Sequence, residues 1–175
     1  AMIGDDPEDY LARTSVKWLH KLGVNVMTMS PAKKDYGHHN YPLERIEKAI
    51  SWLKIHGNQK IGIVGASTTG TLALTAASYF KDITLTIGLT PSDFIWQGFM
   101  QGKRDGCKEW PMEGESLFSY KEEPLPYMPF CYKHPDYWHV IEKETKRTGD
   151  MINSRKLFDD SEKAHPITED EIIKI

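Results

Sequence analysis

The sequence predicts an α/β fold in which a parallel sheet is covered by helices. Two observations support this prediction. Apolar segments of strand length alternate with segments of helical length from residue 7 to residue 90. One of the strands, Ile61–Val64, turns sharply at Gly65-Ala66-Ser67 into a helix of small and apolar residues. Such alternation favours right-handed crossover connections, which place neighbouring strands parallel to one another.

Size and charge limit the class of protein. At 175 residues the chain is expected to form a single domain over 1–175, with a core at 1–91 and a lid or helical excursion at 92–165. A formal net charge of −3 argues against nucleic acid as a partner. No apolar run approaches the ~20 residues that span a bilayer, and no signal peptide is visible, so we expect no membrane partner and a cytoplasmic protein. Cys107 and Cys131 have neither metal-ligand nor disulfide spacing.

The first elements follow from helix signals and apolar spacing. Acidic residues and a proline at Asp5–Asp9 predict a helix start, and Gly23 predicts the end of that helix. Val24–Met29 is rich in strand-forming residues and is expected to be a strand, followed by a loop. A second helix is expected over 42–56, because five apolar residues recur there on one face: Leu43, Ile46, Ala49, Ile50 and Leu53.

Two strands and a helix complete the alternating region. The strand Ile61–Val64 leads into a helix that ends near Phe80, and Ile83–Leu89 is the next strand. Together with Val24–Met29, these segments predict three parallel strands. Ligands of parallel sheets bind beyond the carboxyl ends of the strands, and Ser67 lies at one of these ends.

The segment that follows Pro91 has a different composition. Residues 92–138 contain most of the aromatic residues of the chain and lose the alternating pattern. A long excursion from a compact domain is often a lid or a binding segment, so its aromatic side chains are candidates to line an apolar pocket. Alternatively, they only pack the excursion onto the sheet. The substrate-binding candidates are Trp96, Phe99 and Trp110. Helices are expected over 135–147 and 150–163.

Gly65-x-Ser67-x-Thr69 is close to the Gly-x-Ser-x-Gly nucleophile elbow, in which a strained turn exposes the serine hydroxyl. Small residues flank the serine in that motif because neighbouring backbone passes close to them. Thr69 is larger than the usual glycine, and the elbow tolerates it if the Thr69 side chain points away from the strand. The oxyanion-hole donors would be the amide of Thr68 and a second one from the loop at Asp5.

Other interpretations of the turn are weaker. A glycine-rich turn can bind phosphate, but Gly62, Gly65 and Gly70 lack the spacing of a dinucleotide motif, and no Gly-Lys-Ser/Thr is present. A structural turn with an incidental serine is the remaining alternative. Three residues on the aromatic excursion loosely suggest a metal site, although we expect no metal: His134, Asp136 and His139.

A nucleophilic serine needs a histidine base and a carboxylate that orients the base, in the chain order serine, acid, histidine. Asp93, just beyond the strand Ile83–Leu89, is the candidate acid. Three histidines follow it, but none comes after a strand that carries an acid: His134, His139 and His165. The sequence therefore predicts a nucleophile and leaves its base unassigned.

Several segments together resemble a known family: Pro42–Lys54, Ile61–Ser67, Leu72–Ser78, Trp110–Pro129 and His165–Glu169. They are similar to the α/β-hydrolase domain of acyl-CoA thioesterases and bile acid-CoA:amino acid N-acyltransferases, which is dienelactone-hydrolase-like. Trp110–Pro129 resembles the insertion of that family, and His165–Glu169 resembles the approach to its next strand. The resemblance spans roughly residues 4–175.

The resemblance implies a parallel-sheet α/β-hydrolase core with an aromatic-rich lid insertion. It implies that Ser67 attacks an acyl ester or an acyl thioester such as acyl-CoA, with no cofactor. Three basic residues are then candidates to meet the CoA phosphates, although a solvated charge run is the simpler interpretation: Lys103, Arg104 and Lys108. The family's acid and histidine follow the segment that ends at Ile175. The resemblance therefore implies an incomplete domain, completed by a second polypeptide segment or a homodimer.

Two classes of function follow. The first is a serine hydrolase of the acyl-CoA thioesterase type, which works through an acyl-enzyme on Ser67. The alternative is a non-catalytic α/β-hydrolase-like protein that binds a small acyl compound without turnover. Covalent labelling of Ser67 distinguishes the two.

Overall fold

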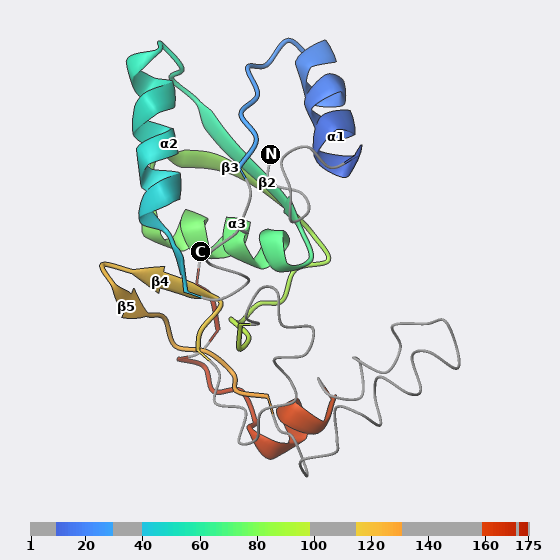
Figure 1. Cartoon of the computed structure of the whole chain (residues 1–175), viewed down its shortest axis with the longest axis vertical. Helices are drawn as coiled ribbons and strands as arrows, with labels where there is room; N and C mark the ends of the chain where they lie inside the picture. The colour runs from blue at the N-terminus through green and yellow to red at the C-terminus, as the bar shows by residue number, and fades with distance from the viewer. Residues whose placement is uncertain (1–9, 30–39, 99–114, 131–158, 171, 175) are drawn as a thin grey trace.

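The computed structural model describes residues 10–29, 40–98, 115–130, 159–170 and 172–174. Its strands form two small sheets, one in the order β1-β4-β5 and one in the order β2-β3 (Figure 1). The elements in chain order are α1 (Tyr10–Lys21), β1 (Tyr41–Pro42), α2 (Glu44–Ile55), β2 (Ile61–Ala66), α3 (Thr68–Tyr79), β3 (Ile83–Leu89), β4 (Phe118–Tyr120) and β5 (Glu123–Pro124).

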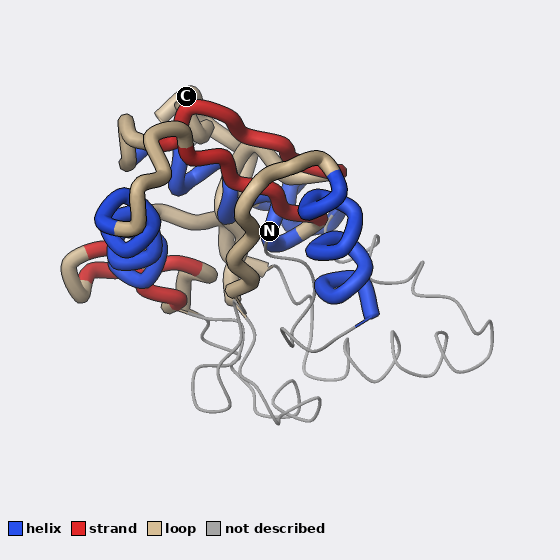
Figure 2. The backbone as a smooth tube through the Cα atoms, turned by 90° about the horizontal axis from the view of Figure 1, so that it is seen from above, coloured by secondary structure: helices blue, strands red, loops and turns tan. Residues whose placement is uncertain are grey.

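The central unit is strand–helix–strand. β2 and β3 pair in parallel from Ile61 opposite Ile83 to Ala66 opposite Leu89. α3 packs against both strands, while α1 and α2 lie to either side of the strand pair in both views (Figure 2). β2, α3 and β3 confirm the strand, helix and strand expected between residues 61 and 89, and β2 continues as far as Ala66, the residue before Ser67.

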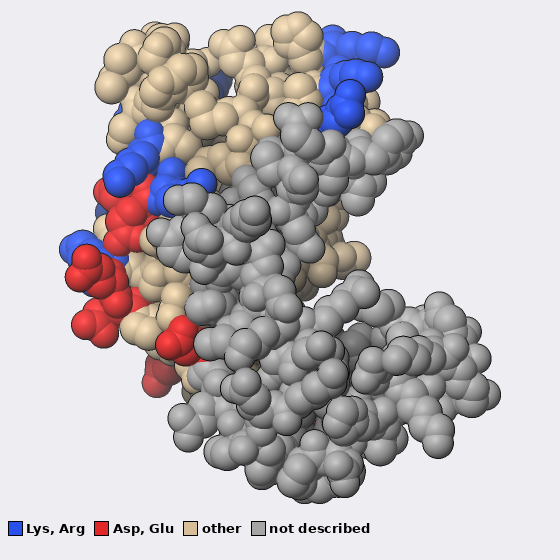
Figure 3. All heavy atoms as spheres, in the orientation of Figure 1, with Lys and Arg blue, Asp and Glu red and all other residues tan. Residues whose placement is uncertain are grey.

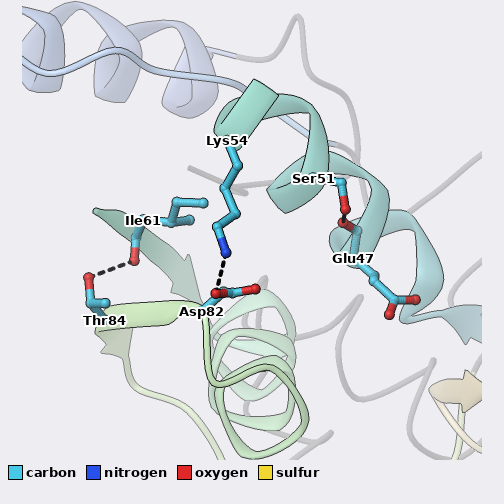
Figure 4. A network of polar contacts seen from close by, with 6 residues as sticks. All are labelled: Glu47, Ser51, Lys54, Ile61, Asp82 and Thr84. Carbon is cyan, nitrogen blue, oxygen red and sulfur yellow. Dashed lines mark hydrogen bonds and ion pairs between the residues drawn. The ribbon is translucent and has the colours of Figure 1, made fainter. Parts of the chain in front are cut away.

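α2 confirms the predicted amphipathic helix. The carboxylates of Glu44 and Glu47 lie in its first turn, where they interact favourably with the positive end of the helix dipole. Ile46 and Ile50 are buried. At the other end, the Lys54 ammonium lies 2.5 Å from the Asp82 carboxylate, on the turn that leads into β3 (Figure 4). Both side chains are about half exposed, so this ion pair contributes only about 0–1 kcal/mol.

Val24–Met29 is not a strand, so the prediction for this segment is wrong. The described parallel sheet has two strands rather than three. Met29 instead packs against the core, and with Met27 it lines an apolar cavity of about 50 Å³ beside α2 and β2. A strand exists only through pairing with a neighbour. Here Val24 is exposed and the other apolar side chains are partly buried without strand pairing, which the composition of the segment could not show.

The described part of the aromatic excursion contains regular structure. β4 pairs in parallel with β1 and in antiparallel with β5. A two-residue turn joins β4 to β5, and its residues Lys121 and Glu122 have φ of 53° and 67°. Phe118 is 1% exposed and belongs to the same core cluster as Leu72 of α3. Tyr120 makes an edge contact with Phe80, with ring centroids 5.9 Å apart. These aromatic side chains pack the excursion onto the helices.

The last described segments adjoin the excursion. Residues 159–164 are helical, and residues 165–170 and 172–174 contain no strand. The amide of Ile173 donates to the carbonyl of Asp93 over 2.6 Å. The helix predicted over 135–147 and most of the one predicted over 150–163 lie outside the described residues.

The described surface in Figure 3 has no single dominant charge. Side chains of both signs border α2 and the β4–β5 hairpin, and basic ones lie over α1 (Figure 3). Within the described ranges, no helix combines the length and the apolar character that crossing a membrane requires.

Tyr41 offers a test of the buried core. Its side chain is 1% exposed, and its hydroxyl has no hydrogen-bond partner among the residues that the structure describes. Because an unpaired buried hydroxyl costs stability, we expect Tyr41→Phe to raise the free energy of unfolding by about 1 kcal/mol. Urea denaturation measures this, with the more exposed Tyr79→Phe as the control. A lower stability for Tyr41→Phe would contradict the unpaired hydroxyl.

The same residue predicts a pH dependence. Burial raises the pKa of Tyr41, and the nearby Arg45 lowers it to a lesser extent. Because the folded state holds the Tyr41 proton more tightly than the unfolded chain does, the free energy of unfolding is not affected by this titration below the unfolded pKa of about 10. It then falls as the pH rises from there through the folded pKa. Tyr41→Phe should therefore remove part of the alkaline loss of stability.

Candidate active site

The backbone of Ser67 has the conformation expected of a nucleophile elbow. Ser67 lies between β2 and α3 with φ of 51° and ψ of −124°, and its side chain is exposed and makes no capping hydrogen bond to the helix. A non-glycine residue with positive φ is strained, and such strain concentrates at functional sites. The hydroxyl therefore projects from the N-terminus of α3, where the helix dipole favours developing negative charge.

The backbone strain at Ser67 predicts that a substitution that relieves it raises the stability of the protein, even though it removes the serine hydroxyl. Ser67→Gly should raise the free energy of unfolding by about 1 kcal/mol, because glycine adopts positive φ without a steric cost. Ser67→Ala, which keeps the Cβ atom, should not give this gain. Thermal denaturation of the two variants measures the difference, and equal stability would contradict backbone strain at this position.

Close backbone packing explains the glycines of the motif. A Cβ atom at Gly65 would lie 1.9 Å from the carbonyl oxygen of Thr69, so only glycine fits there. A Cβ atom at Gly70 would lie 3.2 Å from Pro91, just beyond β3. The first turn of α3 therefore sits directly against the ends of both strands.

The Thr69 side chain does not point away from the strand, so the elbow tolerates it in another way than the sequence suggested. Its side chain is 4% exposed. Its hydroxyl accepts a hydrogen bond from the amide of Ala66 and donates one to the carbonyl of Ala66, both at 2.8 Å. The bulk of threonine is tolerated because its hydroxyl satisfies two backbone groups at the end of β2.

Two residues that sequence reasoning missed join the elbow to the segment after β3. The hydroxyl of Thr71, in the first turn of α3, accepts a hydrogen bond from the amide of Ser92 over 3.0 Å. The hydroxyl of Ser92 in turn accepts from the indole nitrogen of Trp96 over 2.9 Å. A threonine four residues after the serine and a serine just after the next strand were the available signals.

The structure brings three of the predicted site residues onto adjoining segments. Thr68 is the first residue of α3, so its amide has no acceptor within the helix. Asp93 is exposed beside Ser92, and Trp96 is partly buried between Phe94 and Phe130, with ring centroids 4.6 and 5.7 Å away. The other predicted residues lie outside the described ranges: Asp5, Phe99, Trp110, Lys103, Arg104 and Lys108.

No base is identified for Ser67. The described histidines are exposed, at His20, His56 and His165, and no hydrogen bond joins any of them to Ser67. The ring of His56 instead contacts the carbonyl of Trp52 at the end of α2. No group of described residues could hold a metal ion, and His134, Asp136 and His139 lie outside the described ranges.

The chain was compared with protein families, curated proteins and solved structures. A family model described as "BAAT / Acyl-CoA thioester hydrolase C terminal" matches residues 41–156, which include β1, α2, the elbow and β3. Neither a curated protein nor a solved structure matches the chain.

Proposed function

Because this chain belongs to the BAAT/acyl-CoA thioester hydrolase C-terminal family, whose fold is α/β-hydrolase-like, we propose that it is a serine hydrolase of acyl thioesters. The family suggests acyl-CoA thioesterase or acyltransferase-like activity. The observation that best supports Ser67 as the nucleophile is its strained backbone at the tip of β2, with φ of 51° and ψ of −124°. This conformation leaves the hydroxyl exposed where a substrate carbonyl can approach.

The proposed reaction forms an acyl-enzyme. The Ser67 oxygen attacks the carbonyl carbon of the thioester, and a general base takes the hydroxyl proton. The new C–O bond forms, the C–S bond breaks, and the proton passes to the leaving thiolate. Water or an amine then displaces the acyl group from Ser67. The acceptor decides whether the activity is hydrolysis or acyl transfer.

Two further groups are assigned roles in this proposal. The amide of Thr68 donates a hydrogen bond to the oxyanion, which in comparable sites lowers the barrier by about 3 kcal/mol. A second donor from the loop at Asp5 completes the oxyanion hole. Asp93 is the candidate acid, because the bond between Thr71 and Ser92 holds the start of its segment beside the first turn of α3.

The acyl chain is proposed to bind under the aromatic excursion. Trp96, Phe99 and Trp110 would line its path, and residues 92–165 would act as the lid. The partly buried Trp96, which is fixed by a hydrogen bond to Ser92, supports this placement. The phosphates of a CoA carrier would meet Lys103, Arg104 and Lys108.

Labelling with a fluorophosphonate tests the proposal. The protein, produced from its complete reading frame, is incubated with the probe, digested and measured by mass spectrometry. We expect one adduct on the peptide that contains Ser67, and none in Ser67→Ala. An unmodified Ser67 peptide would reject the hydrolase and leave the non-catalytic acyl-binding protein.

A further inference from the structure

We propose that Thr69 is a positioning residue whose hydroxyl holds Ser67 in its reactive backbone conformation. The inference rests on the proposed role of Ser67 as the nucleophile. Thr69 occupies the position at which the elbow motif has glycine, and its side chain is buried, at 4% exposure. It therefore acts through the backbone of the elbow rather than by touching the substrate.

The peptide group between Ala66 and Ser67 is held by hydrogen bonds at both ends. The Thr69 hydroxyl donates to the carbonyl oxygen of this peptide, that of Ala66, over 2.8 Å. The Ser67 nitrogen of the same peptide donates to the carbonyl of Leu89 in β3 over 2.8 Å. Both ends of the peptide plane are thus anchored, one to α3 and one to β3, which fixes the φ angle of Ser67.

A second anchor acts on the other side of Ser67. The carbonyl of Ser67 accepts a hydrogen bond from the amide of Thr71 over 3.0 Å. The strained φ and ψ angles therefore persist because the surrounding hydrogen bonds over-determine them. Among these anchors, the Thr69 hydroxyl is provided by a side chain, so it can be removed by substitution while the backbone stays intact.

The Thr69 hydroxyl also satisfies a second backbone group. It accepts from the amide of Ala66 over 2.8 Å. Since Ser67, the next residue, directs its own amide at β3, the Ala66 amide faces the opposite side of the strand. Loss of the hydroxyl would leave both polar groups of Ala66 without this partner, and the backbone would shift to recover hydrogen bonds elsewhere.

The test compares three substitutions at this position with one control. Thr69→Val removes the hydroxyl at similar volume, Thr69→Ala removes it without added bulk, and Thr69→Ser retains it. Thr75→Val is the matched control, because Thr75 is a buried threonine of the same helix whose hydroxyl bonds a helix carbonyl, that of Thr71, over 2.9 Å. The readouts are the fluorophosphonate labelling rate of Ser67 and hydrogen exchange at the Ala66 amide.

We expect the labelling rate to fall by about tenfold or more in Thr69→Val and Thr69→Ala, as the loss of one buried hydrogen-bond partner implies. The Ala66 amide should exchange faster in both variants. Thr69→Ser should restore both readouts, and Thr75→Val should change neither, whatever its melting temperature. In steady-state kinetics with an acyl-CoA, the loss should appear in kcat rather than in KM.

The outcomes separate this inference from the proposed function. If the wild-type protein is not labelled on Ser67, the proposed function fails. If the wild type is labelled and the valine and alanine variants keep its labelling rate, the positioning role of Thr69 is rejected while the nucleophile stands. Should the valine variant fail to fold, the alanine and serine variants decide the question through the same two readouts.

Discussion

Ser67→Ala is expected to lower kcat for acyl-CoA hydrolysis by at least about 10⁴-fold with little change in KM, because the removed oxygen is the proposed covalent nucleophile. Alanine keeps the Cβ atom and the helix start, so the variant should fold and bind substrate as the wild type does. Steady-state hydrolysis of an acyl-CoA, followed through release of the free thiol, measures the effect.

The matched control for that substitution is Ser78→Ala. Ser78 is an exposed serine near the end of the same helix, and its hydroxyl only donates to the carbonyl of Thr75, over 2.7 Å. Its removal should leave kcat within about threefold of the wild type, since surface substitutions of this kind change little. Activity that survives in Ser67→Ala at the level of this control would show that Ser67 is not the nucleophile.

Gly65→Ala is expected to have the largest effect on stability. The added Cβ atom would lie 1.9 Å from the Thr69 carbonyl oxygen and 2.8 Å from the Gly70 nitrogen, and both obstacles are backbone atoms. Since backbone cannot move aside as a flexible side chain can, we expect destabilisation of about 3 kcal/mol or more, or failure to fold. The free energy of unfolding in urea, or the soluble yield, reports this.

Gly62→Ala is the control for the Gly65 prediction. Both glycines belong to β2, but a Cβ atom at Gly62 would meet Leu85 at 3.5 Å, which is an ordinary van der Waals contact. This variant should stay within about 0.5 kcal/mol of the wild type. Equal destabilisation by the two substitutions would mean that the tight approach at Gly65 does not exist in solution.

Local patterns were sufficient to predict the central unit. The apolar run of β2, the small residues of α3 and the apolar run of β3 each indicate one element, and all three are confirmed. α2 was predictable because its buried residues recur at helical spacing. In each of these segments the local preference and the tertiary environment agree.

The sequence does not predict the strands correctly where pairing between distant parts of the chain decides the structure. β1 has two residues and exists only because Tyr41 lies opposite Phe118, far away in the sequence. The β4–β5 turn uses Lys121 and Glu122 at positive φ, where the usual signal would be Asn-Gly. Val24–Met29 has strand-forming residues but packs through its side chains. None of these outcomes can be read from local composition.

The site was predictable in part. The motif around Ser67 predicted the strained turn, and the structure has a positive φ at that residue. The hydrogen bonds of Thr69 depend on the dihedral angles of the elbow and its helix, so the sequence could not predict their direction. The roles of Ser67, Thr68 and Asp93 stay predictions, because each depends on the position of a substrate.

Trapping the acyl-enzyme is the most direct test of the central claim. The protein is mixed with an acyl-CoA, quenched in acid within its first turnovers, digested and measured by mass spectrometry. We predict that the peptide containing Ser67 gains the mass of the acyl group and loses it as the substrate is consumed. Turnover without an acyl adduct on that peptide, or with an adduct on another residue, would contradict Ser67 as the nucleophile.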